Sequence, residues 1–107
     1  MSGFRFMRMI VFFDLPMETL EEKRNYRNFR KALIENGFIM LQKSVYCKMM
    51  TSPTVEKSMK NIIHKNKPSA GVVQSLTVTE KQFVKMDYVV GEYTSDVIDT
   101  EDRLVVL

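Results

Sequence analysis

Four segments of the chain carry the apolar patterns of β-strands. Residues 9–13 read Met-Ile-Val-Phe-Phe, a continuous apolar run that is typical of a strand buried on both faces in the middle of a sheet, and Pro16 ends it. Residues 38–41 and 45–49 follow with a short polar turn between them, which predicts a hairpin or one long bent strand. Residues 71–79 alternate apolar and polar side chains, as in a strand with two different faces.

Two further segments carry the spacing of amphipathic helices. In residues 19–36 apolar side chains recur every three or four positions, and Gly37 is suited to the left-handed conformation that ends a helix. A second helix is predicted to begin at Ser52, because serine is a good N-cap and Pro53 is favoured in the first turn. Residues 79–82 match a capping box, which predicts one more short helical turn.

The order of these elements predicts an α+β fold of the ferredoxin-like type, βαββαβ, with two helices on one face of an antiparallel sheet. Residues 86–90 and 104–107 are further strand candidates, and the last of them is an extra C-terminal strand suited to the sheet edge of a second subunit. We expect one domain of 107 residues, with its core at about 6–91 and a C-terminal dimerisation or partner segment at about 92–107. A chain of this size buries a modest share of its surface, which favours a homodimer.

Composition favours a cytoplasmic protein. No apolar run approaches the roughly 20 residues that a membrane span requires, and the N-terminal segment lacks the pattern of a signal peptide. Cys47 is the single cysteine, so neither an internal disulfide nor a cysteine metal cluster is expected within one chain. We therefore expect no membrane partner.

Charge is divided unevenly along the chain. Through Lys85 there are fifteen Lys and Arg against seven Asp and Glu, whereas from Met86 onward Arg103 alone is basic against six acidic residues. This division indicates either a polyanion on one surface and a basic protein on another, or charges that only keep a small domain soluble. Basic side chains cluster beside the apolar stripe of the first helix, which favours nucleic-acid phosphates as a partner: Lys23, Arg24, Arg27, Arg30 and Lys31.

Asp14 is the main candidate for chemistry. A carboxylate at the end of a buried central strand is held on a rigid element, and oxygen ligands suit magnesium or manganese. One carboxylate makes a poor metal site in a monomer, but two copies brought together by a dimer axis make a better one. The alternative is a turn residue that hydrogen-bonds the backbone beside Pro16, and spacing alone favours this alternative.

The other candidate residues carry weaker signals. His64, the single histidine, is interpreted as a surface residue near a helix end, and Cys47 as a half-buried strand residue. Ser44 and Tyr46 could contact phosphate or be ordinary hairpin residues. No Walker loop, dinucleotide-binding glycine pattern or zinc-ligand spacing is present.

Four short motifs occur in an order that resembles one family. They read MIVFFDLP at residues 9–16, RxxRKxL at 27–33, GFxxLQxSVY at 37–46 and GVVxxLTVTxxQF at 71–83. From about residue 7 to residue 91 the chain resembles the Cas-two (Cas2) family of CRISPR-associated proteins, in detail the version found in Cas9-containing systems.

The resemblance implies a ferredoxin-like homodimer whose C-terminal strands exchange across the interface. It implies a CRISPR adaptation subunit that supports duplex protospacer DNA between two dimers of the integrase Cas-one (Cas1) during spacer acquisition. It also implies a metal-dependent endonuclease, a phosphodiester hydrolase in which Asp14 of each subunit binds magnesium at the dimer centre. We expect binding to be the main function and cleavage to be secondary and conditional.

Carried onto this chain, the resemblance predicts two contact surfaces. The predicted phosphate contacts are Arg24, Arg27, Arg30 and Lys31, and the acidic residues in 92–102 are the predicted docking site for the integrase. Two other classes of function stay open: a toxin-like small ribonuclease that acts on messenger RNA, and a ferredoxin-like domain that only binds proteins.

Overall fold

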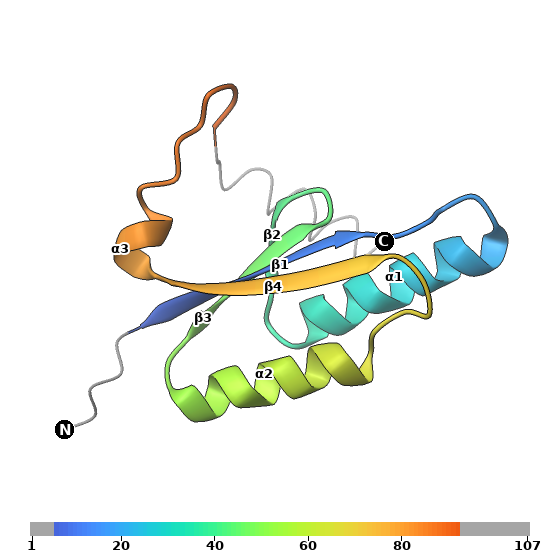
Figure 1. Ribbon diagram of the computed structural model, residues 1–107, viewed down its shortest axis with the longest axis horizontal. Coiled ribbons are helices and arrows are strands. Elements are labelled where there is room, and N and C mark those ends of the chain that lie inside the picture. Colours follow the sequence, from blue (N-terminus) through green and yellow to red (C-terminus); the bar gives the residue numbers. More distant parts are fainter. Residues whose placement is uncertain (1–5, 93–107) are drawn as a thin grey trace.

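A computed structural model describes residues 6–92 and places the predicted apolar strand in the middle of a four-stranded antiparallel sheet (Figure 1). This strand, β1 (Met7–Asp14), pairs with β3 (Val45–Met50) on one side and with β4 (Val72–Thr79) on the other. The fourth strand, β2 (Ile39–Gln42), pairs with β3, so the strand order is β2-β3-β1-β4. This order confirms the predicted α+β, ferredoxin-like arrangement.

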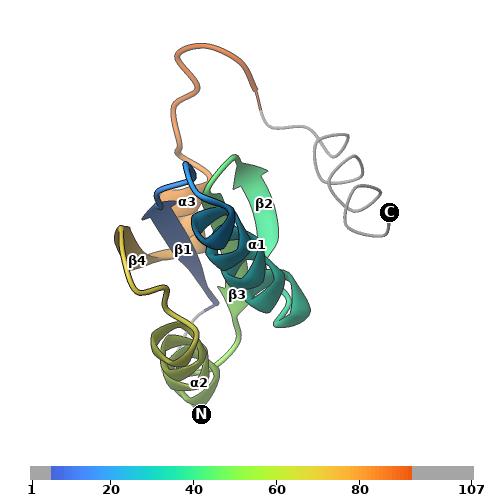
Figure 2. The same cartoon turned by 90° about the vertical axis from the view of Figure 1, so that its right-hand side faces the viewer.

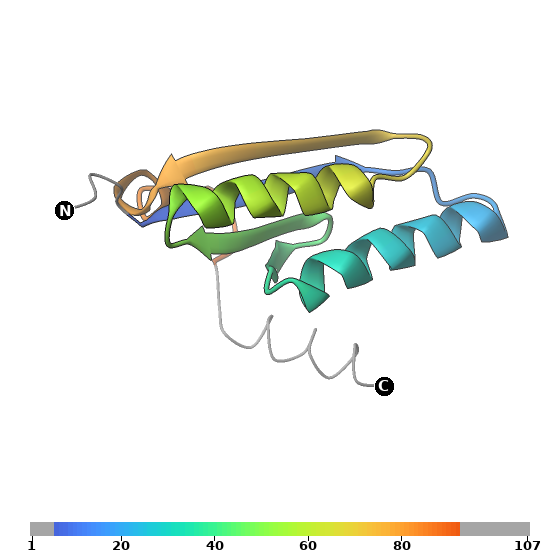
Figure 3. The same cartoon turned by 90° about the horizontal axis from the view of Figure 1, so that it is seen from below.

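Two helices, α1 (Leu20–Glu35) and α2 (Pro53–Lys65), lie on the same face of the sheet (Figure 3). Thr19 caps α1 through a capping box, in which its hydroxyl accepts from the Glu22 N–H and the Glu22 carboxylate accepts from the Thr19 N–H. Ser52 caps α2, as its position before proline predicts. The local capping residues therefore fix where both helices begin.

The core lies between these helices and the sheet. Alternate residues of β1 point toward the helices, and Phe13 is the residue around which the aromatic side chains gather. Its ring centroid lies 5.6 Å from that of Tyr26, 5.1 Å from that of Phe29 and 5.8 Å from that of Tyr46. Burial of each such side chain stabilises the fold by about 1.5–3 kcal/mol, so this cluster holds α1 firmly onto β1 and β3.

The opposite face of the sheet, called here the open face, carries apolar side chains that α1 and α2 do not cover. The register of β1 and β4 places Ile10 opposite Leu76 and Asp14 opposite Val72 on this face. Leu76 is 55% exposed and Val72 is 53% exposed. The alternation predicted for β4 is therefore present, but its apolar side points away from the two long helices.

A short helix, α3 (Glu80–Phe83), follows β4 directly after its capping residue Thr79, as predicted. Arg8 fastens this helix to the open face by donating to both carboxylate oxygens of Glu80, at 2.7 and 3.0 Å. The same guanidinium lies 4.4 Å from the ring centroid of Phe83, a cation–π contact. The hydrogen bonds from Arg8 hold the pKa of Glu80 below its ordinary value.

The prediction of a strand at residues 86–90 is wrong, because the described chain beyond α3 is irregular. The N–H of Met86 donates to the carbonyl of Phe83 at 3.1 Å, which continues the turn of α3 instead of starting a sheet ladder. Residues 84–92 then leave on the side of the sheet away from α2 (Figures 1 and 2). The strand candidate at 104–107 and the proposed dimerisation segment lie outside the described residues, apart from Glu92. Within residues 6–92 no helix has the length and apolar character to span a membrane.

Candidate metal and nucleic-acid site

Asp14 is the last residue of the central strand, and its side chain is exposed. Pairing with Val72 of β4 holds its backbone in the sheet, while its side chain belongs to the open face. Within residues 6–92 no hydrogen bond or ion pair engages the carboxylate. The turn interpretation therefore lacks the hydrogen bond beside Pro16 that it requires, and both carboxylate oxygens are available to a ligand.

A shallow cavity of about 210 Å³ surrounds Asp14 at this end of the sheet. The end of β1, the turn between β2 and β3, and the first residues of β4 line it, and its polar side chains are those of Asp14, Lys43, Ser44 and Gln74. One acidic and one basic residue thus line the same small cavity. The sequence did not indicate Lys43 or Gln74, because neither belongs to a motif with a recognisable spacing.

The turn between β2 and β3 is fixed at Ser44. Its φ of 64° lies in the left-handed region, where it stands alone among the non-glycine residues that the structure describes. The carbonyl of Ser44 accepts from the Phe13 N–H at 3.0 Å, and its hydroxyl lies 3.0 Å from the phenol oxygen of Tyr26. The turn is therefore tied both to the end of β1 and to helix α1.

Gly71 packs against the backbone of Asp14 from the other side. Its φ is +94°, and a Cβ at this position would lie 2.6 Å from the carbonyl oxygen of Asp14 and 2.8 Å from Cδ2 of Leu15. Only glycine fits both the backbone conformation and the space. The end of β1 is thus held between the Ser44 turn and the residue that precedes β4.

Helix α1 carries the predicted phosphate contacts on its outer side. Arg24, Arg27 and Lys31 are exposed, whereas Arg30 is half-buried and its Nε donates to the phenol oxygen of Tyr46 at 2.7 Å. These four basic residues form what we call the α1 basic surface. Because α1 packs on the helix-covered face and Asp14 belongs to the open face, the structure does not bring this surface into the Asp14 cavity.

The other candidate residues, Tyr46, Cys47 and His64, do not form part of the Asp14 cavity. Tyr46 is 1% exposed, its hydroxyl is bonded to Arg30, and burial raises its pKa, so it offers no surface for phosphate. Cys47 is fully buried and accepts from Arg8 at 3.7 Å, and burial raises the pKa of its thiol, which disfavours the reactive thiolate. His64 is exposed in the last turn of α2, as expected.

One chain offers a metal very few ligands. Among the described residues no three His, Cys, Asp or Glu side chains gather as a metal cluster, so Asp14 is the candidate on its own. Magnesium is commonly held by one or two carboxylates together with waters and substrate phosphates, and a lone exposed carboxylate fits such a site when a second subunit or a phosphate completes it. Of the predicted acidic docking segment, Glu92 alone lies within the described residues, where it is exposed.

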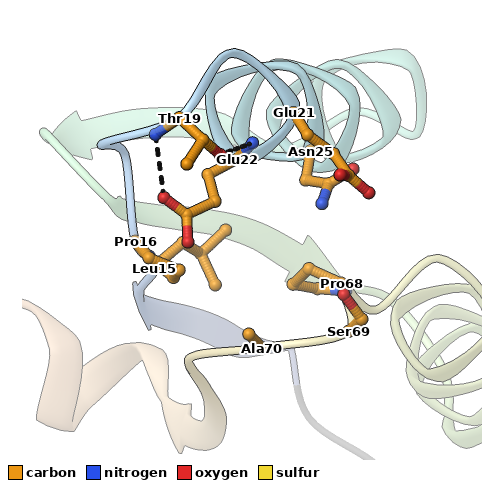
Figure 4. Close-up of a pocket in the computed structure, with 9 residues that line it drawn as sticks. All are labelled: Leu15, Pro16, Thr19, Glu21, Glu22, Asn25, Pro68, Ser69 and Ala70. Atoms are coloured by element: carbon orange, nitrogen blue, oxygen red, sulfur yellow. Dashed lines mark hydrogen bonds between the residues drawn. The ribbon is translucent and has the colours of Figure 1, made fainter.

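A larger cavity of about 310 Å³ lies beside the loop between β1 and α1 (Figure 4). Leu15 and Pro68 form part of its apolar lining, and Glu21 and Glu22 add two acidic side chains to this lining. The carboxylate of Glu22 accepts from the backbone N–H groups of Thr19 and Glu18, which lowers its pKa. This carboxylate is part of the α1 cap, and the two acidic lining residues would repel phosphate.

Fold and site together define a small ferredoxin-like domain with an exposed carboxylate at the end of its central strand and a basic outer helix. The family model for CRISPR associated protein Cas2 matches residues 7–86. The chain is 54% identical over 101 residues to a protein of Treponema denticola, an alignment covering 94% of this chain and 100% of that protein. It is 45% identical to one of Streptococcus mutans serotype c, covering 94% and 93%, and 42% identical to one of Lacticaseibacillus rhamnosus, covering 94% and 100%. All three relatives are named CRISPR-associated endoribonuclease Cas2. The chain belongs to the Cas2 family.

Proposed function

We propose that this protein is a cytoplasmic, homodimeric CRISPR adaptation subunit that binds duplex DNA and bridges dimers of the integrase Cas1 during spacer acquisition. The observation that carries the proposal is the α1 basic surface. Arg24, Arg27 and Lys31 recur at helical spacing on one exposed side of a long helix. Clustered cations of this kind neutralise phosphates and release counterions, which makes duplex binding favourable and dependent on salt.

A second copy of the chain is the proposed partner of the open face. Phe12, Val72 and Leu76 expose apolar surface on this face, and contiguous exposed apolar surface marks an interaction site in a soluble protein. Asp14 belongs to the same face, so a two-fold contact through it would put both Asp14 side chains at the interface. Dimerisation thereby supports the metal site that one chain lacks.

We further propose that Asp14 holds magnesium or manganese and supports cleavage of a phosphodiester bond. The metal would supply Lewis-acid stabilisation of the phosphate and an activated water. RNA is the second candidate substrate, and the names of the relatives, which read endoribonuclease, favour it. Asp14 alone cannot discriminate the two polymers, because a carboxylate–metal site contacts the phosphate and not the sugar.

The test compares cleavage and binding in the same samples. Duplex DNA and RNA are incubated with Mg²⁺ and the wild-type protein or Asp14→Ala, and affinity for each is measured over a range of salt concentrations. We expect Asp14→Ala to abolish metal-dependent cleavage while duplex binding and folding persist. Equal cleavage by both proteins would remove Asp14 from the catalytic site.

The binding surface is tested with Arg24→Ala/Arg27→Ala. Loss of two phosphate contacts should reduce the slope of log K against log salt by about 2. Lys81→Ala is the control, since Lys81 is exposed on α3 at the other end of the sheet. An unchanged slope in the double variant would exclude these two arginines from the interface.

A further inference from the structure

We propose that Lys43 is a phosphate-binding residue of the Asp14 site and that Tyr26 positions it through Ser44. The proposal rests on the proposed function, since it adds a substrate contact and a positioning residue to that same site. It is carried by three observations on the described residues: the shared cavity, the conformation of the turn, and the buried anchor of that turn.

Lys43 lines the cavity from the turn between β2 and β3, and Asp14 lines it from the end of β1. Lys43 is exposed, and within residues 6–92 no ion pair or hydrogen bond engages its ammonium group, not even with Asp14. The Lys43 ammonium is therefore not in contact with the Asp14 carboxylate, and both residues line a cavity of about 210 Å³. A water molecule takes up about 30 Å³, so this space admits a phosphate group. A phosphodiester there would meet the metal-binding carboxylate on one side and a cation on the other.

The backbone of the turn supports a functional role. A left-handed conformation at a non-glycine residue costs of the order of 1–3 kcal/mol and persists where the surroundings enforce it. The other described residues with positive φ are all glycines, namely Gly37, Gly71 and Gly91. Serine at position 44 therefore supplies something that glycine would not. The contact it supplies is the hydrogen bond between its hydroxyl and Tyr26, at 3.0 Å.

Tyr26 is a rigid anchor for this contact. It is 9% exposed on the inner side of α1, and its ring packs against Phe13 with centroids 5.6 Å apart. The Ser44 carbonyl accepts from the Phe13 N–H, so the side chain and the backbone of Ser44 are both held. Lys43 is the adjacent residue, and the direction in which it leaves the turn is set by these bonds. Tyr26 thus acts on the cavity from the core without touching a ligand.

The experiment separates phosphate binding from metal binding. Affinity for Mn²⁺ alone, and for a defined DNA duplex with and without Mn²⁺ at fixed salt, is measured for the wild type, Lys43→Ala, Lys43→Arg and Lys81→Ala. We expect Lys43→Ala to keep Mn²⁺ affinity and to weaken Mn²⁺-dependent duplex binding about tenfold, the loss typical of one charge-assisted hydrogen bond. Lys43→Arg should keep most of the Mn²⁺-dependent affinity for the duplex, and Lys81→Ala should leave this affinity unchanged.

The positioning role is tested by a double-mutant cycle. Tyr26→Phe removes one oxygen, and folding is checked by circular dichroism. If Tyr26 acts through Lys43, the double variant Tyr26→Phe/Lys43→Ala should bind no more weakly than Lys43→Ala alone. Additive losses would overturn the role of Tyr26. A weakening by Lys43→Ala no larger than that by Lys81→Ala would overturn the role of Lys43. If the wild-type protein binds neither Mn²⁺ nor the duplex, the result overturns the proposed function itself, on which the roles of Lys43 and Tyr26 both rest.

Discussion

At the scale of single residues, the surroundings of Asp14 depend on two neighbours with left-handed backbones, present for different reasons. Gly71 lacks a Cβ where one would lie 2.6 Å from the Asp14 carbonyl oxygen. Ser44 has a Cβ, so its φ of 64° is unfavourable, and the hydrogen bond between its hydroxyl and Tyr26 offsets this cost. One residue gives the strand end room and the other fixes the turn beside it.

We predict that Gly71→Ala lowers the free energy of unfolding by about 1–3 kcal/mol, from an unfavourable φ together with a backbone collision. Urea denaturation measures it. Gly91→Ala is the matched control, because Gly91 has φ +80° but a Cβ added there would meet nothing within 4 Å. In Gly91→Ala the free energy of unfolding should fall only by the part that the unfavourable φ causes, about 1 kcal/mol. If the free energy of unfolding falls equally in both variants, the close approach of Gly71 to Asp14 does not contribute to stability.

At the scale of elements, the Arg8–Glu80 ion pair decides where α3 lies. Helix α3 has four residues, too few to be stable from its own hydrogen bonds. Arg8 of the central strand supplies two hydrogen bonds to Glu80 and a cation–π contact to Phe83. A single side chain on the open face therefore sets the direction in which the chain continues.

This anchoring predicts a dependence on pH. Because Arg8 lowers the pKa of Glu80, its stabilisation is present above the ordinary glutamate pKa of about 4.3 and is lost as pH falls through the lowered value. NMR spectra of the α3 amides should therefore change in acid below about pH 4.3. In Glu80→Gln these amides should already be altered at neutral pH. Glu56→Gln, on α2, should behave as wild type, and a wild-type spectrum for Glu80→Gln would contradict the anchor.

At the scale of the whole molecule, the two faces of the sheet differ in what covers them. The helix-covered face is closed by the aromatic cluster around Phe13, and the open face exposes apolar groups from β1 and β4. The α1 basic surface and the open face point in different directions. A dimer through the open face therefore leaves the basic side of each copy accessible to a polyanion.

We predict that Leu76→Asp converts the proposed dimer to a monomer without unfolding the chain. Leu76 is 55% exposed in one chain, so a charge there costs the monomer little but would be buried in the dimer. Sedimentation velocity measures the change in mass. Asn61→Asp adds the same charge on the exposed outer side of α2 and should stay dimeric. If Leu76→Asp also stays dimeric, the interface lies elsewhere.

The sequence by itself determined the elements from β1 to α3 and their order. Helix starts at Thr19, Ser52 and Thr79 are set by hydrogen bonds within a few residues, and such local chemistry is visible in the sequence. The continuous apolar run of residues 9–13 was enough to predict a central strand with Asp14 at its end. The motifs were enough to indicate the family, which the comparisons confirm.

Only the tertiary structure decided what surrounds Asp14. Segments distant along the chain are joined by the contact of Ser44 with Tyr26, by the approach of Gly71 to Asp14, and by the cavity that Lys43 and Asp14 both line. The contacts of Arg8 with α3 also decided where residues 86–90 begin, and the packing of α1 and α2 left the apolar side of β4 uncovered by these two helices. Periodicity predicts that a strand has an apolar side, but what covers that side depends on how the elements pack.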